Sequence, residues 1–164
     1  MNSPKHGEFR ALIDLEDVNK VKDYTWGIMK PYSPRIKCDI FYVQTQNKHI
    51  SDRLLHRYLM NCPHGMVVDH IDGDSLNNQK SNLRICTKAE NNMNRRMYSN
   101  NTTGHLGVYD LGDKYVNRWL ARIKVGGHGI NLKYCFTYEE AVSVREDAEK
   151  KYYGEFLRPI EESA

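Results

Sequence analysis

The segment from Met66 to Asn92 concentrates carboxylate, imidazole and amide side chains, more than turns require. It contains an adjacent carboxylate and imidazole, Asp69 and His70, followed by a loop rich in asparagine. Hydrolysis needs a base that deprotonates water and a cation that neutralises charge on the phosphate and the leaving oxygen. Imidazole titrates near neutral pH, which suits the base, and carboxylate and amide oxygens suit Mg²⁺. These residue types therefore indicate a metal-assisted hydrolytic site.

The elements around this pair have the order strand, loop, strand, helix. Apolar runs at residues 66–71 and 82–87 predict the two strands. Thr87 then begins a Thr-x-x-Glu capping box, so a helix should start at Lys88.

Strand geometry should separate the two reactive side chains. Adjacent residues on a strand point to opposite faces, so Asp69 and His70 can serve the metal and the water separately. Asn91, near the start of the following helix, can lie back against the strands and complete the metal site, with Asn92 as the alternative ligand.

Turn chemistry alone is the competing interpretation of this loop. A lone Asp-His pair is usually structural, and asparagine is common in turns, where we place Asn77 and Asn78. The joint spacing of four polar positions favours a functional site: Asp69, His70, Asn82 and Asn91.

The composition is that of a polar globular chain with 164 residues, 40% hydrophobic residues and a net charge of +3. This length allows one medium domain or two small ones. The four cysteines form no CxxC pair, so we expect no structural zinc. No secretory h-region or long apolar run is present, so we expect a cytoplasmic protein with reduced thiols and no membrane contact.

The segment before the site should be a lead-in of short strands. Residues 8–15 and 40–46 have the β-branched and aromatic content of strands. Residues 51–61 predict a short amphipathic helix, which Ser51 or Asp52 would cap.

The last third of the chain predicts a three-stranded antiparallel sheet packed on one helix, with a domain boundary at residues 99–103. The expected strands are residues 104–112, 118–127 and 130–137. Thr137 should cap the helix and Gly154 should end it. The expected buried positions of that helix are Ala141, Val144, Ala148 and Tyr152.

In the middle strand, apolar and basic residues alternate, so one face should pack on the helix, Trp119 included. The other face should be mostly basic, with Arg118, Arg122 and Lys124. Residues 101–137 hold five basic and two acidic residues, whereas residues 138–155 hold three basic and six acidic. Such a division suits a sheet that meets a polyanion, although an ordinary solvated face is the alternative.

Several short motifs occur in this order: Leu55-His56-Arg57, Asp69-His70, the turn from Asp72 to Asn78, Asn82-Leu83-Arg84 and Glu90-Asn91-Asn92. Together they resemble the HNH endonucleases of the phage and intron-homing type. The resemblance implies a ββα-metal unit with one divalent ion, Mg²⁺ or alternatively Mn²⁺. The implied site residues are His70 as general base, Asn82 as brace of the loop, Asp69 and Asn91 as metal ligands, and His56 and Arg57 as DNA contacts, with simple packing as the alternative for His56.

Residues 103–158 resemble a second family. The runs "GHLGV", "RWLARI" and "TYEEAVSVREDAEKKYYGEF" are similar to the Apetala/ethylene-response-factor-type DNA-binding domain. This resemblance implies that the sheet enters the DNA major groove with the helix behind it. It also implies that four basic side chains of the sheet face the DNA: Arg118, Arg122, Lys124 and Lys133. The pattern departs at "NLKYCF", where Lys133 replaces a glycine and one residue is inserted.

We therefore expect an α+β protein with an HNH nuclease module at residues 1–98, its ββα-metal core at 66–96, and a DNA reader at 103–158. The expected function is that of a metal-dependent, site-preferring endonuclease of the homing type. It would nick or cleave double-stranded DNA as a monomer in the cytoplasm of a phage-infected bacterium, leaving 5′-phosphate and 3′-hydroxyl ends. The alternatives are a DNA-binding regulator with an inactive HNH scaffold, and a nuclease that acts on RNA or on DNA without site preference.

Overall fold

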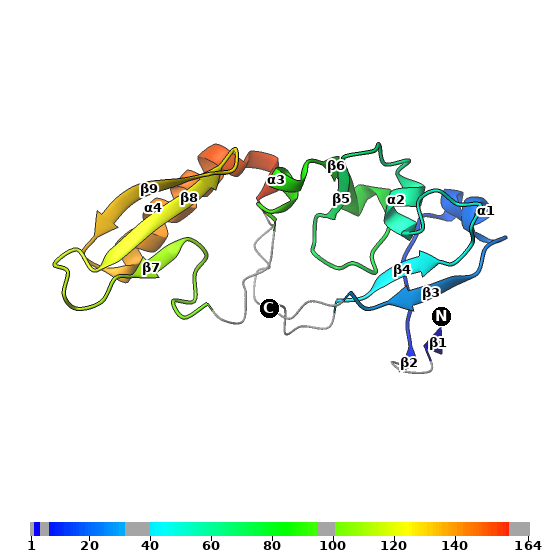
Figure 1. Ribbon diagram of the computed structural model, residues 1–164, viewed down its shortest axis with the longest axis horizontal. Coiled ribbons are helices and arrows are strands. Elements are labelled where there is room, and N and C mark those ends of the chain that lie inside the picture. Colours follow the sequence, from blue (N-terminus) through cyan, green and yellow to red (C-terminus); the bar gives the residue numbers. More distant parts are fainter. Residues whose placement is uncertain (1, 4–6, 32–39, 95–100, 158–164) are drawn as a thin grey trace. The chain divides into compact units, whose positions relative to one another are not determined.

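The computed structural model describes residues 2–3, 7–31, 40–94 and 101–157 (Figure 1). Short antiparallel strands and a few helices make an α+β protein, which confirms the predicted fold class. The described residues form two compact units, one up to residue 94 and the other from residue 101. Cys38 and part of the predicted boundary at residues 99–103 lie outside the described residues. None of the described helices is long and apolar enough to cross a membrane.

Two antiparallel strand pairs begin the first unit. They are β1 (Asn2–Ser3) with β2 (Gly7–Glu8), and β3 (Trp26–Met29) with β4 (Tyr42–Thr45). The helix α1 (Val18–Val21) lies between β2 and β3 in the chain. β4 confirms the strand that the sequence predicts at residues 40–46.

The strand predicted at residues 8–15 is wrong, because β2 ends at Glu8. Leu12 instead forms an isolated bridge with the polar loop of the site. Its amide donates to the carbonyl of Leu76 at 2.9 Å, and its carbonyl accepts from the amide of Asn78 at 2.8 Å. This segment therefore anchors the loop rather than extending a sheet.

The helix α2 (Leu55–Leu59) begins after Leu54, and neither Ser51 nor Asp52 caps it. The Asp52 carboxylate instead accepts from Arg57 Nε at 2.8 Å, which places it beside the helix rather than at its start. Leu55 and Leu59 are buried with Val43 of β4 and form the core of this part of the unit.

The site is built on a hairpin and a short helix. β5 (Val67–His70) pairs antiparallel with β6 (Leu83–Cys86), and α3 (Lys88–Asn91) follows. Thr87 caps α3 through the predicted box: its hydroxyl accepts from the Glu90 amide, and the Glu90 carboxylate accepts from the Thr87 amide. The predicted order of strand, loop, strand and helix is thus confirmed.

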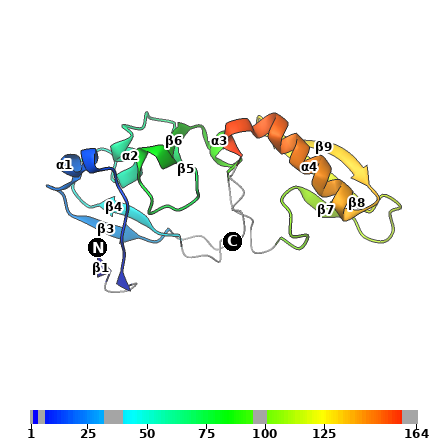
Figure 2. The ribbon, with the colours of Figure 1, turned by 180° about the vertical axis from the view of Figure 1, so that it is seen from behind.

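The second unit is a three-stranded antiparallel sheet covered on one face by a helix. β7 (Val108–Asp110), β8 (Trp119–Val125) and β9 (His128–Cys135) lie in chain order. The helix α4 (Tyr138–Tyr153) runs along one face, and Figure 2 shows it in front of the strands. The core residues between sheet and helix are Val108, Ala121, Cys135 and Ala141.

The ends of α4 follow the sequence prediction, but its buried face differs at one position. Thr137 accepts from the Glu140 amide at the start, and Gly154 ends the helix with a φ of 51°. Tyr153 is 8% exposed, whereas Tyr152 is 40% exposed, so the prediction that Tyr152 is buried is wrong. A buried arginine, Arg145, also lies on this face and donates to the carbonyl of Leu106.

Candidate active site and DNA-contacting face

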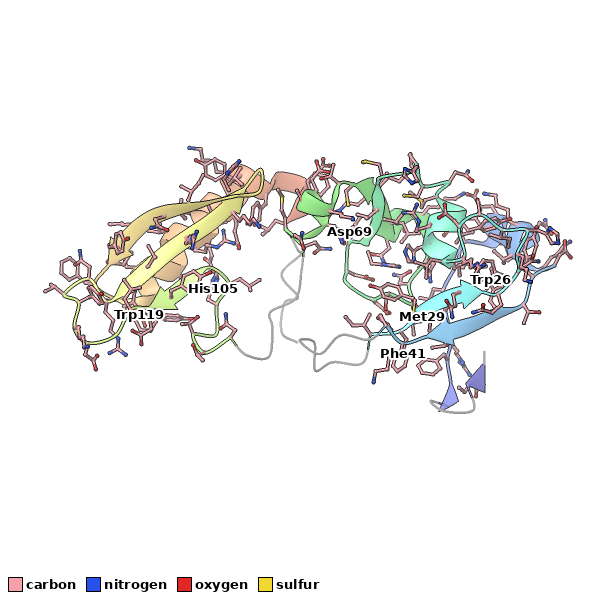
Figure 3. All side chains as sticks on the ribbon, in the orientation of Figure 1. Trp26, Met29, Phe41, Asp69, His105 and Trp119 are labelled. Carbon is pink, nitrogen blue, oxygen red and sulfur yellow. The ribbon has the colours of Figure 1, made fainter. Side chains whose placement is uncertain are left out.

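The Asp69 carboxylate is buried, with a residue exposure of 6%, and is surrounded by donors (Figure 3). Arg84 lies directly opposite Asp69 in the β5–β6 ladder. Its Nε and Nη2 atoms donate to Asp69 Oδ2 at 2.9 and 2.6 Å. Asn94, just beyond α3, donates through Nδ2 to both carboxylate oxygens at 3.0 Å. The carboxylate therefore has a fixed orientation.

Asn94 also ties the segment after α3 to the backbone of β5. The same Nδ2 contacts the carbonyl oxygens of His70 and Ile71 at 2.9 and 3.3 Å. Asn94 is buried, and its Oδ1 has no hydrogen-bond partner among the described residues. A buried amide oxygen without a partner is costly in an apolar setting, and it is a natural ligand for a hard cation.

The His70 side chain packs against two aromatic rings, away from the contacts of Asp69. Its ring centroid lies 5.0 Å from that of His56 and 6.4 Å from that of Tyr42. His70 Nε2 lies 3.4 Å from Oδ1 of the fully buried Asn78. Asp69 and His70 have separate partners, as predicted for adjacent strand residues whose side chains point to opposite faces.

Burial lowers the pKa of His70 below its ordinary value, since a charged imidazolium loses hydration in the interior. The hydrogen bond to Asn78 and the nearby carboxylates of Asp72 and Asp69 oppose this effect without cancelling it. His70 is therefore neutral near neutral pH, which is the protonation state that a general base requires.

The predicted DNA contacts in the first unit are not supported by their surroundings. His56 is 6% exposed and packs against Tyr42 and His70, so its ring lies in the interior. Arg57 donates to the Asp52 carboxylate and to the carbonyl of Met66, contacts that hold α2 to the start of β5. The alternative given for His56, simple packing, agrees with its burial.

Asn82 braces the loop between the two strands. Its Oδ1 accepts from the amide of Asp72 at 3.0 Å, and its Nδ2 donates to Asp72 Oδ1 and to the carbonyl of Asn77, each at 2.9 Å. The residue that contacts His70 Nε2 is Asn78, which the sequence assigns to the turn. Asn82 thus holds the loop that carries the direct partner of the imidazole.

The two candidate ligands on α3 differ in their surroundings. Asn92 is exposed, and its Nδ2 donates to the carbonyl of Lys88 at 2.7 Å. Asn91 is half-buried on a helix that packs beside β5. The local hydrogen bond of Asn92 favours Asn91 as the ligand, and that role remains a prediction.

The outer face of the second sheet carries part of the predicted basic set. Arg122 and Lys124 are exposed on β8. Arg118 precedes β8; it donates to Asp110 at 2.7 and 2.6 Å, also pairs with Asp113, and lies over the Trp119 ring.

Lys133 lies on the opposite side, so the prediction that it shares this face is wrong. A β-bulge falls between Ala121 and Arg122, and Lys133 pairs with Ala121, whose side chain is fully buried beneath α4. Lys133 Nζ accordingly contacts Glu140 of α4 at 2.7 Å. The extra residue of the bulge is Leu132, which has no partner in the ladder between Lys133 and Asn131.

Two half-exposed tyrosines complete the outer face. Tyr109 of β7 and Tyr134 of β9 both lie opposite Leu120 of β8 and are 49% and 50% exposed. Trp119 packs on the core side against Tyr138, with 5.1 Å between ring centroids, as the alternation predicts.

The model of an HNH endonuclease family matches residues 61–93, the segment that contains β5, β6 and α3. Protein 3.8 of Escherichia phage T7 is 41% identical over 96 residues, which cover 58% of this chain and 77% of that protein. A protein of Acanthamoeba polyphaga mimivirus named as an HNH endonuclease is 28% identical, over 91% of this chain and 73% of its own length. This chain belongs to the HNH endonuclease family.

A third relative of this HNH endonuclease is YosQ of Bacillus subtilis strain 168, a prophage-derived protein whose name describes an HNH homing endonuclease. It is 46% identical over 50 residues, which cover 30% of this chain and 28% of that protein. No solved structure gives a significant match. The family match ends at residue 93, so the Apetala-type resemblance of residues 103–158 stays a prediction.

The cluster around Asp69 fits the divalent ion that HNH endonucleases generally use. It offers one carboxylate and the unpartnered amide oxygen of Asn94. Within the described part of the chain, no three His, Cys, Asp or Glu side chains gather as a metal-binding group. An ion held here would therefore take amide oxygens and water beside Asp69, a ligand set that suits Mg²⁺.

Sequence reasoning missed Asn78 and Asn94. Asn78 lies in a run of turn-forming residues, where an amide is usually assigned to local backbone bonding. Asn94 follows the predicted helix by three residues, and no local pattern indicates that the chain returns to β5 there. The polarity of both residues is visible in the sequence, whereas their burial depends on tertiary packing.

Proposed function

We propose that this endonuclease hydrolyses double-stranded DNA with a divalent ion, Mg²⁺ or alternatively Mn²⁺, that Asp69 and Asn91 hold. The unpartnered amide oxygen of Asn94 is a further candidate ligand. His70 acts as the general base. The observation that carries this proposal is the separation of the two side chains on β5: Asp69 is bound by fixed donors, whereas His70 lies among rings, where burial lowers its pKa.

The contact with Asn78 supports different tasks for the two nitrogens of His70. An amide oxygen accepts, so His70 Nε2 carries the hydrogen and Nδ1 keeps the free lone pair. Nδ1 is then the atom that takes a proton from water. The ion, when bound, stabilises negative charge on the phosphate and the leaving 3′-oxygen. The products carry 5′-phosphate and 3′-hydroxyl ends.

The second unit would give this nuclease its preference for a site. Arg122 and Lys124 face outward, and their charges can neutralise phosphates or read base edges, Arg most often at guanine. The exposed rings of Tyr109 and Tyr134 add apolar contact area to that face. The Apetala-type resemblance supports this orientation. The name of the relative YosQ, a prophage-derived HNH homing endonuclease, supports homing-type action in the cytoplasm of a phage-infected bacterium.

Incubation of the purified protein with supercoiled plasmid tests the proposal. We expect nicked circles with Mg²⁺ or Mn²⁺ and no cleavage in EDTA, because a monomer holds a single active centre. The nicks should be sealed by DNA ligase without prior treatment, as 5′-phosphate and 3′-hydroxyl ends allow. Cleavage that is equal in EDTA, or nicks that need phosphatase or kinase treatment before ligation, would contradict it.

A further inference from the structure

We propose that Arg84 has two tasks: it positions the Asp69 carboxylate, and it is the charge partner of that carboxylate while no ion is bound. The inference rests on the proposed function, since it gives Asp69 the role of metal ligand. It assigns a task to a side chain that otherwise looks like an ordinary cross-strand ion pair.

The geometry of the pair leaves one carboxylate oxygen with fewer contacts. A bidentate arginine places one N–H on each oxygen of its partner. Here both donors of Arg84, Nε and Nη2, contact the same oxygen of Asp69, Oδ2, at 2.9 and 2.6 Å. Oδ1 is contacted by Asn94 at 3.0 Å. Oδ1 is thus the oxygen with lone pairs left for a cation, and Arg84 fixes the orientation that leaves it so.

Burial explains why such a partner is needed. The side chains of Asp69 and Arg84 are 7% and 15% exposed. A buried carboxylate without a cation is strongly unfavourable, and removing one member of a buried pair leaves the other uncompensated. In the metal-free protein Arg84 supplies the compensating charge. In the metal-bound protein the ion supplies more of it, and the remaining task of Arg84 is orientation.

These two tasks predict two separate effects of replacing Arg84, one on stability and one on turnover. Without Arg84, the Asp69 carboxylate has no charge partner in the metal-free protein. Binding of an ion should therefore stabilise an Arg84 variant more than it stabilises the native protein. The carboxylate also loses its fixed orientation, so turnover should fall even when the metal saturates the site. A side chain with only a structural task would lower the stability of both states alike.

The experiment measures the melting temperature of the full chain without metal and with saturating Mn²⁺, together with kcat and KM on plasmid. For Arg84→Met we expect a lower metal-free melting temperature, a larger Mn²⁺-induced rise than in the native protein, and kcat lower by about 10–100-fold with KM for DNA unchanged. Arg84→Lys keeps the charge but not the two-donor contact. It should recover most of the metal-free stability and little of kcat, and it serves as the folded variant if Arg84→Met does not fold.

Arg53→Met, which changes an exposed arginine of the same unit, is the matched control and should leave both melting temperatures unchanged. An equal or smaller Mn²⁺-induced rise in Arg84→Met, or native kcat in Arg84→Lys, would overturn the inference. Asp69→Asn distinguishes a failure of the proposed metal site from a failure of the role of Arg84. If the Mn²⁺-induced rise in melting temperature in Asp69→Asn equals that of the native protein, the proposed metal site itself is overturned. If Asp69→Asn loses this rise but the Arg84 variants show the native rise and the native kcat, only the role of Arg84 is overturned.

Discussion

The rings of His56 and His70 lie edge to face, with centroids 5.0 Å apart and an interplanar angle of 71°, inside the nuclease unit. Both are buried, and Tyr42 lies 5.5 Å from the first ring and 6.4 Å from the second. The His70 imidazole is therefore held by packing as well as by its hydrogen bond to Asn78. A base that must meet one water molecule benefits from such restriction, because little orientation remains to be lost during the reaction.

His56 should make the nuclease unit labile in acid. Burial lowers the pKa of His56 from 6.5 to about 3, and the nearby His70 and Arg57 charges act in the same direction. Above pH 6.5 the residue is neutral in both the folded and the unfolded chain. Below it the unfolded chain binds a proton that the folded chain does not, so the free energy of unfolding falls by up to about 1.4 kcal/mol per pH unit.

Urea unfolding between pH 7 and pH 4 measures this effect. His56→Phe keeps a ring against Tyr42 but removes the titrating group, so its stability should fall less steeply toward acid than that of the native chain. His49→Phe, at an exposed position, should keep the native dependence. Equal slopes in His56→Phe and the native chain would contradict the buried, neutral state of His56.

The acid limb of the pH–rate profile should lie below the ordinary histidine range. Because the pKa of His70 is lowered by burial, the neutral ring persists as the pH falls through 6.5, and kcat/KM should decline only at lower pH. A limb at or above pH 6.5 at saturating metal would argue against His70 as the base, or against its burial.

Substitutions of Asn78 should shift the acid limb of the pH–rate profile, and the direction of the shift should depend on the new side chain. The contact of its amide oxygen with Nε2 raises the pKa of His70. Asn78→Ala should therefore move the acid limb to lower pH, lower kcat and cost about 1–3 kcal/mol of stability for the lost buried partner. Asn78→Asp places a carboxylate oxygen at the same position and should move the limb to higher pH. Shifts of the same sign in both variants would refute this role.

Arg122 and Lys124, but not Lys133, should contribute to DNA affinity. The first two side chains are exposed on the face away from α4, whereas Lys133 pairs with Glu140 on the helix side. Replacing either Arg122 or Lys124 by alanine should weaken binding and reduce the salt dependence of the binding constant by about one ion per phosphate contact. Titrations of labelled DNA at several salt concentrations measure this. An equal loss in Lys133→Ala would place the binding face elsewhere.

Features of the fold that rest on local chemistry could be predicted from the sequence. The capping box at Thr87 and the side-chain cap at Thr137 fix where α3 and α4 begin, because each threonine accepts from an amide only three positions ahead. At α4 the reciprocal bond of the box is not formed, since the Glu140 carboxylate accepts from the amide of Phe136. The alternation in β8 predicts the buried side of Trp119 and Ala121 because strand periodicity is equally local.

Features that depend on distant partners could not be predicted. The bulge that turns Lys133 toward α4 is a property of strand pairing, and the burial of Asn78 depends on its contact with Leu12. The motif spacing placed Asp69 and His70 on the correct strand, yet the donors around them, Arg84 and Asn94, depend on ladder register and on the chain after α3. The sequence identifies which residues are polar, but only the tertiary structure shows which of them contact one another.

The central claim is that His70 is the general base of a metal-dependent DNA endonuclease, and the rate of plasmid nicking by His70→Ala at saturating Mg²⁺ tests it most directly. The account predicts a first-order nicking rate lower by about 10²–10⁴-fold in a variant that circular dichroism shows to be folded. Nicking by His70→Ala at the native rate would contradict it.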